Sequence, residues 1–122
     1  MARRKTARAA GPVETFPNPE RKREYVVEFE VPEYTAVCPK TGQPDFGTIR
    51  IRYAPDRSCL EMKSLKLYFF GYRDRGVFYE AAVNEILDDL VASCRPRWME
   101  VVGEFAPRGG MTATVTVRWP RL

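Results

Sequence analysis

Four segments of this sequence alternate apolar and polar residues with a period of two, and apolar stripes with helical spacing lie between the second and third of them. A period of two places successive side chains on opposite faces of a strand, whereas spacings of three and four residues place them on one face of a helix. The chain is therefore expected to form two strands, then helices, then two strands. This order is typical of an α+β domain.

The first two alternating runs carry opposite charges on their polar faces. The run from Tyr25 to Val31 places glutamates between its apolar residues, and the run from Ile49 to Tyr53 places arginines there. Antiparallel pairing of these neighbours would bring acids beside arginines, which favours one register. Pro55 is expected to end the second strand.

Two helices are expected in the middle of the chain. Apolar residues at helical spacing over 65–72 predict a short helix that begins near Ser64, which could act as its N-cap. The clearest helical stripe runs from Val77 to Ser93, and Arg95-Pro96 stops it.

The last third of the sequence predicts a β-hairpin. Residues 98–105 and 111–119 alternate as strands, and the connection Ala106-Pro107-Arg108-Gly109-Gly110 predicts a tight turn. The expected fold is a four-stranded antiparallel sheet with two helices on one face, in the order ββααββ. Such a sheet has open edges, so pairing between subunits is expected.

Charge divides the chain into a leader and a neutral body. The net charge of +4 comes from four basic residues among the first 13, because the other 16 lysines and arginines balance 16 acids. Residues 1–22 have no periodicity and predict a disordered basic leader, and residues 23–122 predict a single domain. No segment has the length and hydrophobicity of a membrane span or of a secretory signal, which favours a cytoplasmic location.

The cysteine and histidine content restricts the chemistry. Three cysteines at wide spacing, with no Cys-x-x-Cys pair, argue against a disulfide framework. The sequence contains no histidine, which excludes an imidazole base and removes the commonest zinc ligand, so no metal site is predicted.

The segment from Val37 to Phe46 is the strongest candidate for a reactive site. It places the Cys38 thiol and the Asp45 carboxyl seven residues apart on a connection that Pro39, Gly42 and Pro44 keep irregular. A thiol at the end of a strand, with an acid on the following turn, is suited to nucleophilic chemistry. The alternative is that Cys38 is a small buried hydrophobe.

Four segments together resemble a known enzyme family. They are Val37-Cys38-Pro39-Lys40-Thr41-Gly42-Gln43-Pro44-Asp45-Phe46, Glu61-Met62-Lys63-Ser64-Leu65-Lys66, Phe78-Tyr79-Glu80 with Val83-Asn84, and Pro107-Arg108-Gly109-Gly110. In this order and spacing they are similar to the small, single-domain NADPH-dependent 7-cyano-7-deazaguanine reductases of queuosine biosynthesis, which belong to the tunnelling-fold group. The resemblance extends from about Tyr25 to Trp119.

The resemblance implies a role for each matching residue. Cys38 would attack the nitrile carbon to form a thioimide, two NADPH molecules would then deliver two hydrides, and Asp45 would donate a proton. The substrate base would contact Leu60, Glu61, Met62, Tyr79 and Glu80. NADPH would contact Lys63, Ser64, Lys66 and Arg108. Tyr79 stands where the family commonly has histidine, and a tyrosine hydroxyl could replace the imidazole.

The resemblance also implies partners. The substrate would be the free deazaguanine base rather than tRNA, and the sites would lie between the subunits of a homo-oligomer, commonly two stacked rings. Direct binding of nucleic acid or membrane is not expected.

Two other functions remain open from the residues alone. A thiol peroxidase would place threonine three residues before its cysteine, as Thr35 precedes Cys38, but it would also require proline at position 31, where this chain has Val31. An RNA-binding module could use the basic leader, although it would require exposed aromatic residues on a basic sheet face, and the polar face here also carries acids.

Overall fold

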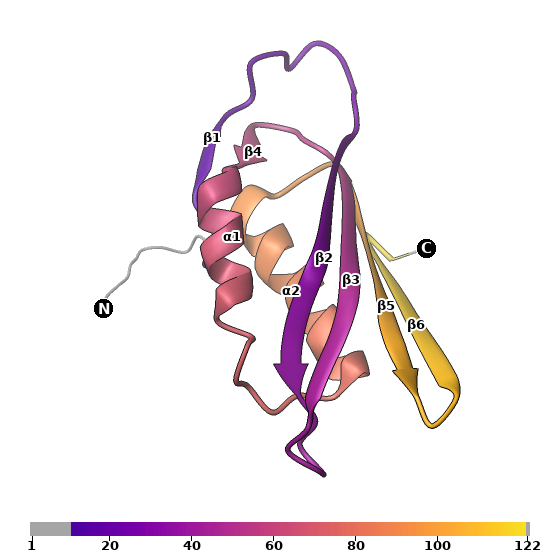
Figure 1. Ribbon diagram of the computed structural model, residues 1–122. Helices are drawn as coiled ribbons and strands as arrows, with labels where there is room; N and C mark the ends of the chain where they lie inside the picture. The colour runs from indigo at the N-terminus through magenta and orange to yellow at the C-terminus, as the bar shows by residue number, and fades with distance from the viewer. Residues whose placement is uncertain (1–10, 122) are drawn as a thin grey trace.

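The computed structural model describes residues 11–121, which form an α+β fold of two helices and two antiparallel sheets. Figure 1 shows both helices on the same side of the larger sheet. The elements in chain order are β1 (Thr15–Pro17), β2 (Val27–Val37), β3 (Pro44–Ala54), β4 (Ser58–Leu60), α1 (Met62–Phe70), α2 (Tyr79–Cys94), β5 (Trp98–Arg108) and β6 (Met111–Trp119). The α+β class predicted from the sequence is confirmed.

The larger sheet has four strands in the order β2-β3-β5-β6, and each neighbouring pair is antiparallel. The register of β2 and β3 pairs Glu28 with Arg52 and Glu30 with Arg50. Side-chain ion pairs join both of these pairs, as the opposite charges of the two runs predicted. All four side chains are well exposed, so each pair contributes little to stability and mainly favours the register.

The core fills the space between this sheet and the helices. The inner faces of β3 and β5 supply fully buried side chains, and the apolar stripe of α2 covers them (Figure 1). The buried side chains include Ile49, Ile51, Tyr53, Val83, Ile86, Leu90, Met99 and Val101. The helical and strand periodicities in the sequence therefore correspond to the faces that are buried.

The N-terminal segment differs from the expected leader. Residues 1–10 lie outside the described residues, but residues 15–17 pair with residues 58–60 as a small antiparallel sheet. The side chain of Val13 is 2% exposed and belongs to the core, and its backbone N–H donates to Ser93 Oγ. The expectation of disorder up to residue 22 is therefore wrong for this part, because three pairs of backbone partners and one buried valine hold it against the domain.

Helix α1 begins two residues earlier than predicted, at Met62, and its cap is Glu61 rather than Ser64. The Glu61 carboxylate accepts hydrogen bonds from the backbone N–H groups of Lys63 and Ser64 at 2.9 and 2.7 Å. These bonds satisfy two of the donors that a helix start leaves free. The Ser64 hydroxyl instead accepts from the backbone N–H of Glu14.

Three strands are longer than the alternation indicated. Strand β2 continues to Val37 after a register shift between Val31 and Tyr34, and β3 begins at Pro44, five residues before the alternating run. Strand β5 continues to Arg108, so that the turn shrinks to Gly109 and Gly110. Both glycines have positive φ, which other residues rarely adopt. The extension of β2 places Cys38 directly beyond the end of the strand.

Candidate functional site

The Cys38 thiol lies at the tip of the β2–β3 hairpin. The Cys38 backbone N–H donates to the carbonyl of Gln43, and the Gly42 N–H donates to the carbonyl of Cys38, both at 2.8 Å. Gly42 has a φ of 74°, a conformation that suits glycine in such a turn. The side chain of Cys38 is partly exposed, and it is not one of the core residues.

Hydrogen bonds within this turn favour the thiolate form of Cys38. The Thr41 hydroxyl and the backbone N–H groups of Thr41 and Lys40 lower the pKa of the Cys38 thiol, with the hydroxyl contributing most. Slight burial and the charge of Asp45 act in the opposite direction without cancelling this effect. A thiolate is the nucleophilic form of cysteine, so the turn activates this residue.

Asp45 lies on the same side of the sheet as Cys38. Ala36 and Asp45 are paired across β2 and β3, and Cys38 follows Ala36 by two residues, which returns its side chain to that side. Asp45 is only 4% exposed, and its Oδ1 accepts a hydrogen bond from the Tyr79 hydroxyl at 3.1 Å. The same oxygen forms an ion pair with Arg108 Nη1.

Helix α2 and strand β5 hold Tyr79 above this acid. The N–H of Val77 donates to the carbonyl of Val37, which fixes the start of α2 beside the end of β2. The Tyr79 ring stacks on Phe105 with centroids 3.9 Å apart and planes 8° apart. Phe105 in turn covers Gly47, where a Cβ atom would approach the Phe105 ring to 2.9 Å. Burial and the bond to Asp45 raise the pKa of the Tyr79 hydroxyl, which therefore remains a hydrogen-bond donor.

The predicted site residues form two groups at opposite ends of the domain. One group lies near the β2–β3 turn and the start of α2, and consists of Cys38, Asp45, Tyr79, Glu80 and Arg108. The other lies at β4 and the first two turns of α1, and consists of Leu60, Glu61, Met62, Lys63, Ser64 and Lys66. Figure 1 shows these two regions at opposite ends of the sheet.

The separation of the two groups is large. The backbone N–H of Leu60 donates to the hydroxyl of Tyr53, and Tyr53 lies eight residues along β3 from Asp45. Eight residues of extended strand span roughly 26 Å. A single ligand of nucleobase size cannot contact both groups within one chain.

Several predicted ligand-binding side chains are available to a ligand. Lys63, Lys66, Met62 and Glu80 are exposed. Within residues 11–121, neither lysine nor Glu80 takes part in a side-chain ion pair. The Glu61 carboxylate is committed to the α1 cap, and its bonds to the Lys63 and Ser64 N–H groups lower the pKa of its carboxyl.

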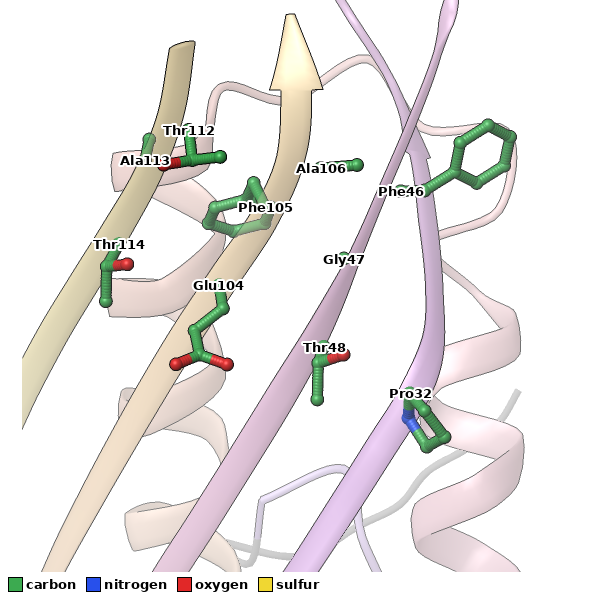
Figure 2. Close-up of a pocket in the computed structure, with 10 residues that line it drawn as sticks. All are labelled: Pro32, Phe46, Gly47, Thr48, Glu104, Phe105, Ala106, Thr112, Ala113 and Thr114. Carbon is green, nitrogen blue, oxygen red and sulfur yellow. The ribbon is translucent and has the colours of Figure 1, made fainter.

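Two cavities formed by residues within 11–121 lie away from Cys38. A hollow of about 480 Å³ lies on the sheet face opposite the helices, and Figure 2 shows Thr48, Glu104 and Thr114 around it. A second, more apolar groove of about 340 Å³ lies between β2 and α1. Neither is lined by Cys38, Asp45 or Tyr79.

No cluster of three or more potential metal ligands occurs among residues 11–121. No helix in the same range combines the length and hydrophobicity needed to cross a bilayer.

A partly exposed cysteine with a lowered thiol pKa, beside a buried acid on a small α+β domain, has the features of a cysteine-nucleophile enzyme. The sequence model described as QueF-like protein matches residues 44–121. The chain belongs to this family, which confirms the resemblance inferred from its four segments.

Curated relatives agree closely over most of the chain. One from Anaeromyxobacter dehalogenans (strain 2CP-C) is 58% identical over 87% of this chain and 87% of its own length. One from Chlorobaculum tepidum is 54% identical over 89% of this chain and 93% of its own, and one from Nitrosococcus oceani is 52% identical over 88% and 83%. All three are named NADPH-dependent 7-cyano-7-deazaguanine reductase. These matches favour neither a thiol peroxidase nor an RNA-binding module.

A crystal structure of the archaeosine synthase QueF-Like in the apo form has a similar fold. Its TM-score is 0.76 at 20% identity, and the match covers 83% of this chain and 99% of that one. At this identity the likeness concerns the fold alone.

Proposed function

We propose that this protein is an oxidoreductase that uses two NADPH molecules to reduce the nitrile of 7-cyano-7-deazaguanine to the aminomethyl group of 7-aminomethyl-7-deazaguanine, in the synthesis of queuosine for tRNA. The observation that carries the proposal is the activated Cys38 thiol on the same side of the sheet as the buried Asp45. Relatives more than 50% identical carry the name of this reductase.

Cys38 would form a covalent thioimide with the substrate. Its sulfur attacks the electrophilic nitrile carbon, and the nitrile nitrogen gains a proton as the carbon–sulfur bond forms. Asp45 is the acid within reach of this position and would deliver that proton. The hydrogen bond from the Tyr79 hydroxyl orients the Asp45 carboxyl.

An exposed carboxylate is suited to the purine-like edge of the substrate. A carboxylate has two acceptor oxygens, which match an adjacent ring N–H and exocyclic amine. Glu80 is exposed at the first turn of α2, next to Tyr79, and would anchor the base beside Cys38. Glu61, with Leu60 and Met62, would contact it from the start of α1.

The residues assigned to NADPH fit an anionic cofactor. Lys63 and Lys66 project from the first two turns of α1 and form no ion pair among the described residues, so their charges are available to phosphates. NADPH would supply the hydride for each of the two reductions. Ser64 is tied to Glu14 through its hydroxyl, which fixes the position of this turn.

A complete site requires at least two subunits. Because the Cys38 group and the Leu60–Ser64 group lie at opposite ends of one chain, they can meet only when one subunit's β2–β3 turn lies beside another's α1 start. The four-stranded sheet ends in β2 and β6, neither of which has an outer partner within residues 11–121. A tunnelling-fold ring that joins these edges, stacked on a second ring, would satisfy both requirements.

The direct test is whether oxidation of NADPH depends on the nitrile. Purified protein should oxidise NADPH only when 7-cyano-7-deazaguanine is present, and should consume two NADPH for each amine formed. Absorbance at the nicotinamide band, with the product quantified by chromatography, measures both. Oxidation that proceeds equally without the nitrile, or no oxidation at all, would exclude the proposed reaction.

A further inference from the structure

Arg108 lies beside Asp45 rather than free in solvent. Its Nη1 pairs with Asp45 Oδ1, and its Nη2 donates to Gln43 Oε1 at 3.0 Å. Gln43 is also the residue whose carbonyl accepts from the Cys38 N–H. One guanidinium therefore joins the end of β5 to both the carboxylate and the Cys38 turn.

Asp45 brings a buried negative charge close to Cys38, and a cation beside it offsets that charge. Asp45 is buried, and its charge disfavours a thiolate at Cys38. The Asp45 charge also acts on Tyr34 and Tyr79, and both are neutral at physiological pH because burial raises the pKa of each hydroxyl. Arg108 is a cation near both groups. Burial opposes its charge, but the hydrogen bond to Asp45 and the charges of Asp45 and Cys38 outweigh this and raise the pKa of the Arg108 guanidinium.

We propose that Arg108 is a positioning residue for thioimide formation, which holds the Asp45 carboxyl group in place beside the Cys38 turn so that this group can take the thiol proton and pass it to the nitrile nitrogen. This inference rests on the proposed function. It assigns Arg108 to the step before any hydride transfer, whereas the family resemblance assigns it to NADPH.

The step balances without a further reactant. The Cys38 S–H bond breaks and its proton moves to Asp45, while the sulfur forms a bond to the nitrile carbon. One π bond of the nitrile becomes an electron pair on nitrogen, and this pair takes the proton from Asp45. Asp45 returns to its carboxylate form, with which the Arg108 guanidinium pairs.

The test measures thioimide formation in the absence of NADPH. The full chain is mixed with 7-cyano-7-deazaguanine at one fixed pH, and intact mass spectrometry follows the adduct over time. Arg108→Met should slow adduct formation by about tenfold or more, the effect of losing one close charge partner. Arg108→Lys keeps the charge without the planar fork and should restore part of the rate.

A matched arginine at the other end of the hairpin provides the control. Arg118 lies near the end of β6, opposite Glu100, and Arg118→Met should form the adduct at the wild-type rate. An Arg108→Met protein that forms the adduct at the wild-type rate, or an Arg108→Lys protein that is as slow as Arg108→Met, would overturn the inference. Failure of the wild-type protein to form any adduct would instead contradict the proposed function.

Discussion

At the scale of single residues, the turn after β2 determines how reactive Cys38 is. The sequence indicated a thiol and an acid on one connection, and spacing alone placed them near each other. The sequence could not indicate that Arg108, which lies 63 residues after Asp45, forms an ion pair with that acid. A contact between residues so far apart in sequence depends on the lengths and register of the strands, and β5 extends three residues beyond its predicted end.

The Thr41 hydroxyl should control the titration of Cys38. Because its hydrogen bond stabilises the thiolate, Thr41→Val should raise the thiol pKa and move the midpoint of alkylation by iodoacetamide to higher pH. Thr41→Ser retains the hydroxyl and should titrate like the wild type. Peptide mapping of alkylated Cys38 across pH measures the shift, and equal midpoints in Thr41→Val and wild type would contradict this role.

At the scale of elements, patterns of period two and of helical spacing were sufficient for the four long strands and both helices. The short strands β1 and β4 were missed because three residues are too few to show a period. The predicted start of α1 was wrong because serine is a more common N-cap than glutamate, which favoured Ser64, whereas Glu61 is the cap in the structure. Both errors concern elements whose position depends on a few hydrogen bonds rather than on an apolar stripe.

The ordered part of the N-terminal segment should contribute to stability. Val13 is 2% exposed within the core, so Val13→Ala should lower the free energy of unfolding by about 1 to 3 kcal/mol. Phe16, on the same segment, is 46% exposed, and Phe16→Ala should have a much smaller effect. Chemical denaturation of both variants measures the difference. Equal stability of Val13→Ala and wild type would show that the segment is not part of the core in solution.

In the whole molecule, the proposed reaction requires active sites that are shared between subunits. Sequence resemblance suggested interfaces, and the separation of the Cys38 and Leu60–Ser64 groups within one chain gives a physical reason for them. The sequence does not give this separation, because its alternation predicted a strand only over residues 49–53. In the structure β3 is one continuous strand from Pro44 to Ala54, which separates the two groups.

Two inactive variants should therefore complement each other when they share an assembly. Cys38→Ala and Glu61→Gln damage different groups, so a mixed oligomer contains some sites in which both groups are intact. Random mixing of equal amounts should restore about a quarter of the wild-type activity at two-subunit sites. Co-expression with distinct affinity tags isolates the mixed species. Activity no higher than that of the separate variants would contradict shared sites.

The claim on which the mechanism depends is that the Cys38 sulfur bonds to the nitrile carbon. Intact mass spectrometry after incubation with 7-cyano-7-deazaguanine, without NADPH, measures this directly. The expected result is a mass increase equal to one substrate molecule, mapped by peptide analysis to Cys38 and absent from Cys38→Ala. Cys94→Ala should still form the adduct, because Cys94 is 2% exposed in the core and its loss affects packing. No adduct in the wild-type protein, or an adduct that persists in Cys38→Ala, would contradict a covalent bond between Cys38 and the substrate.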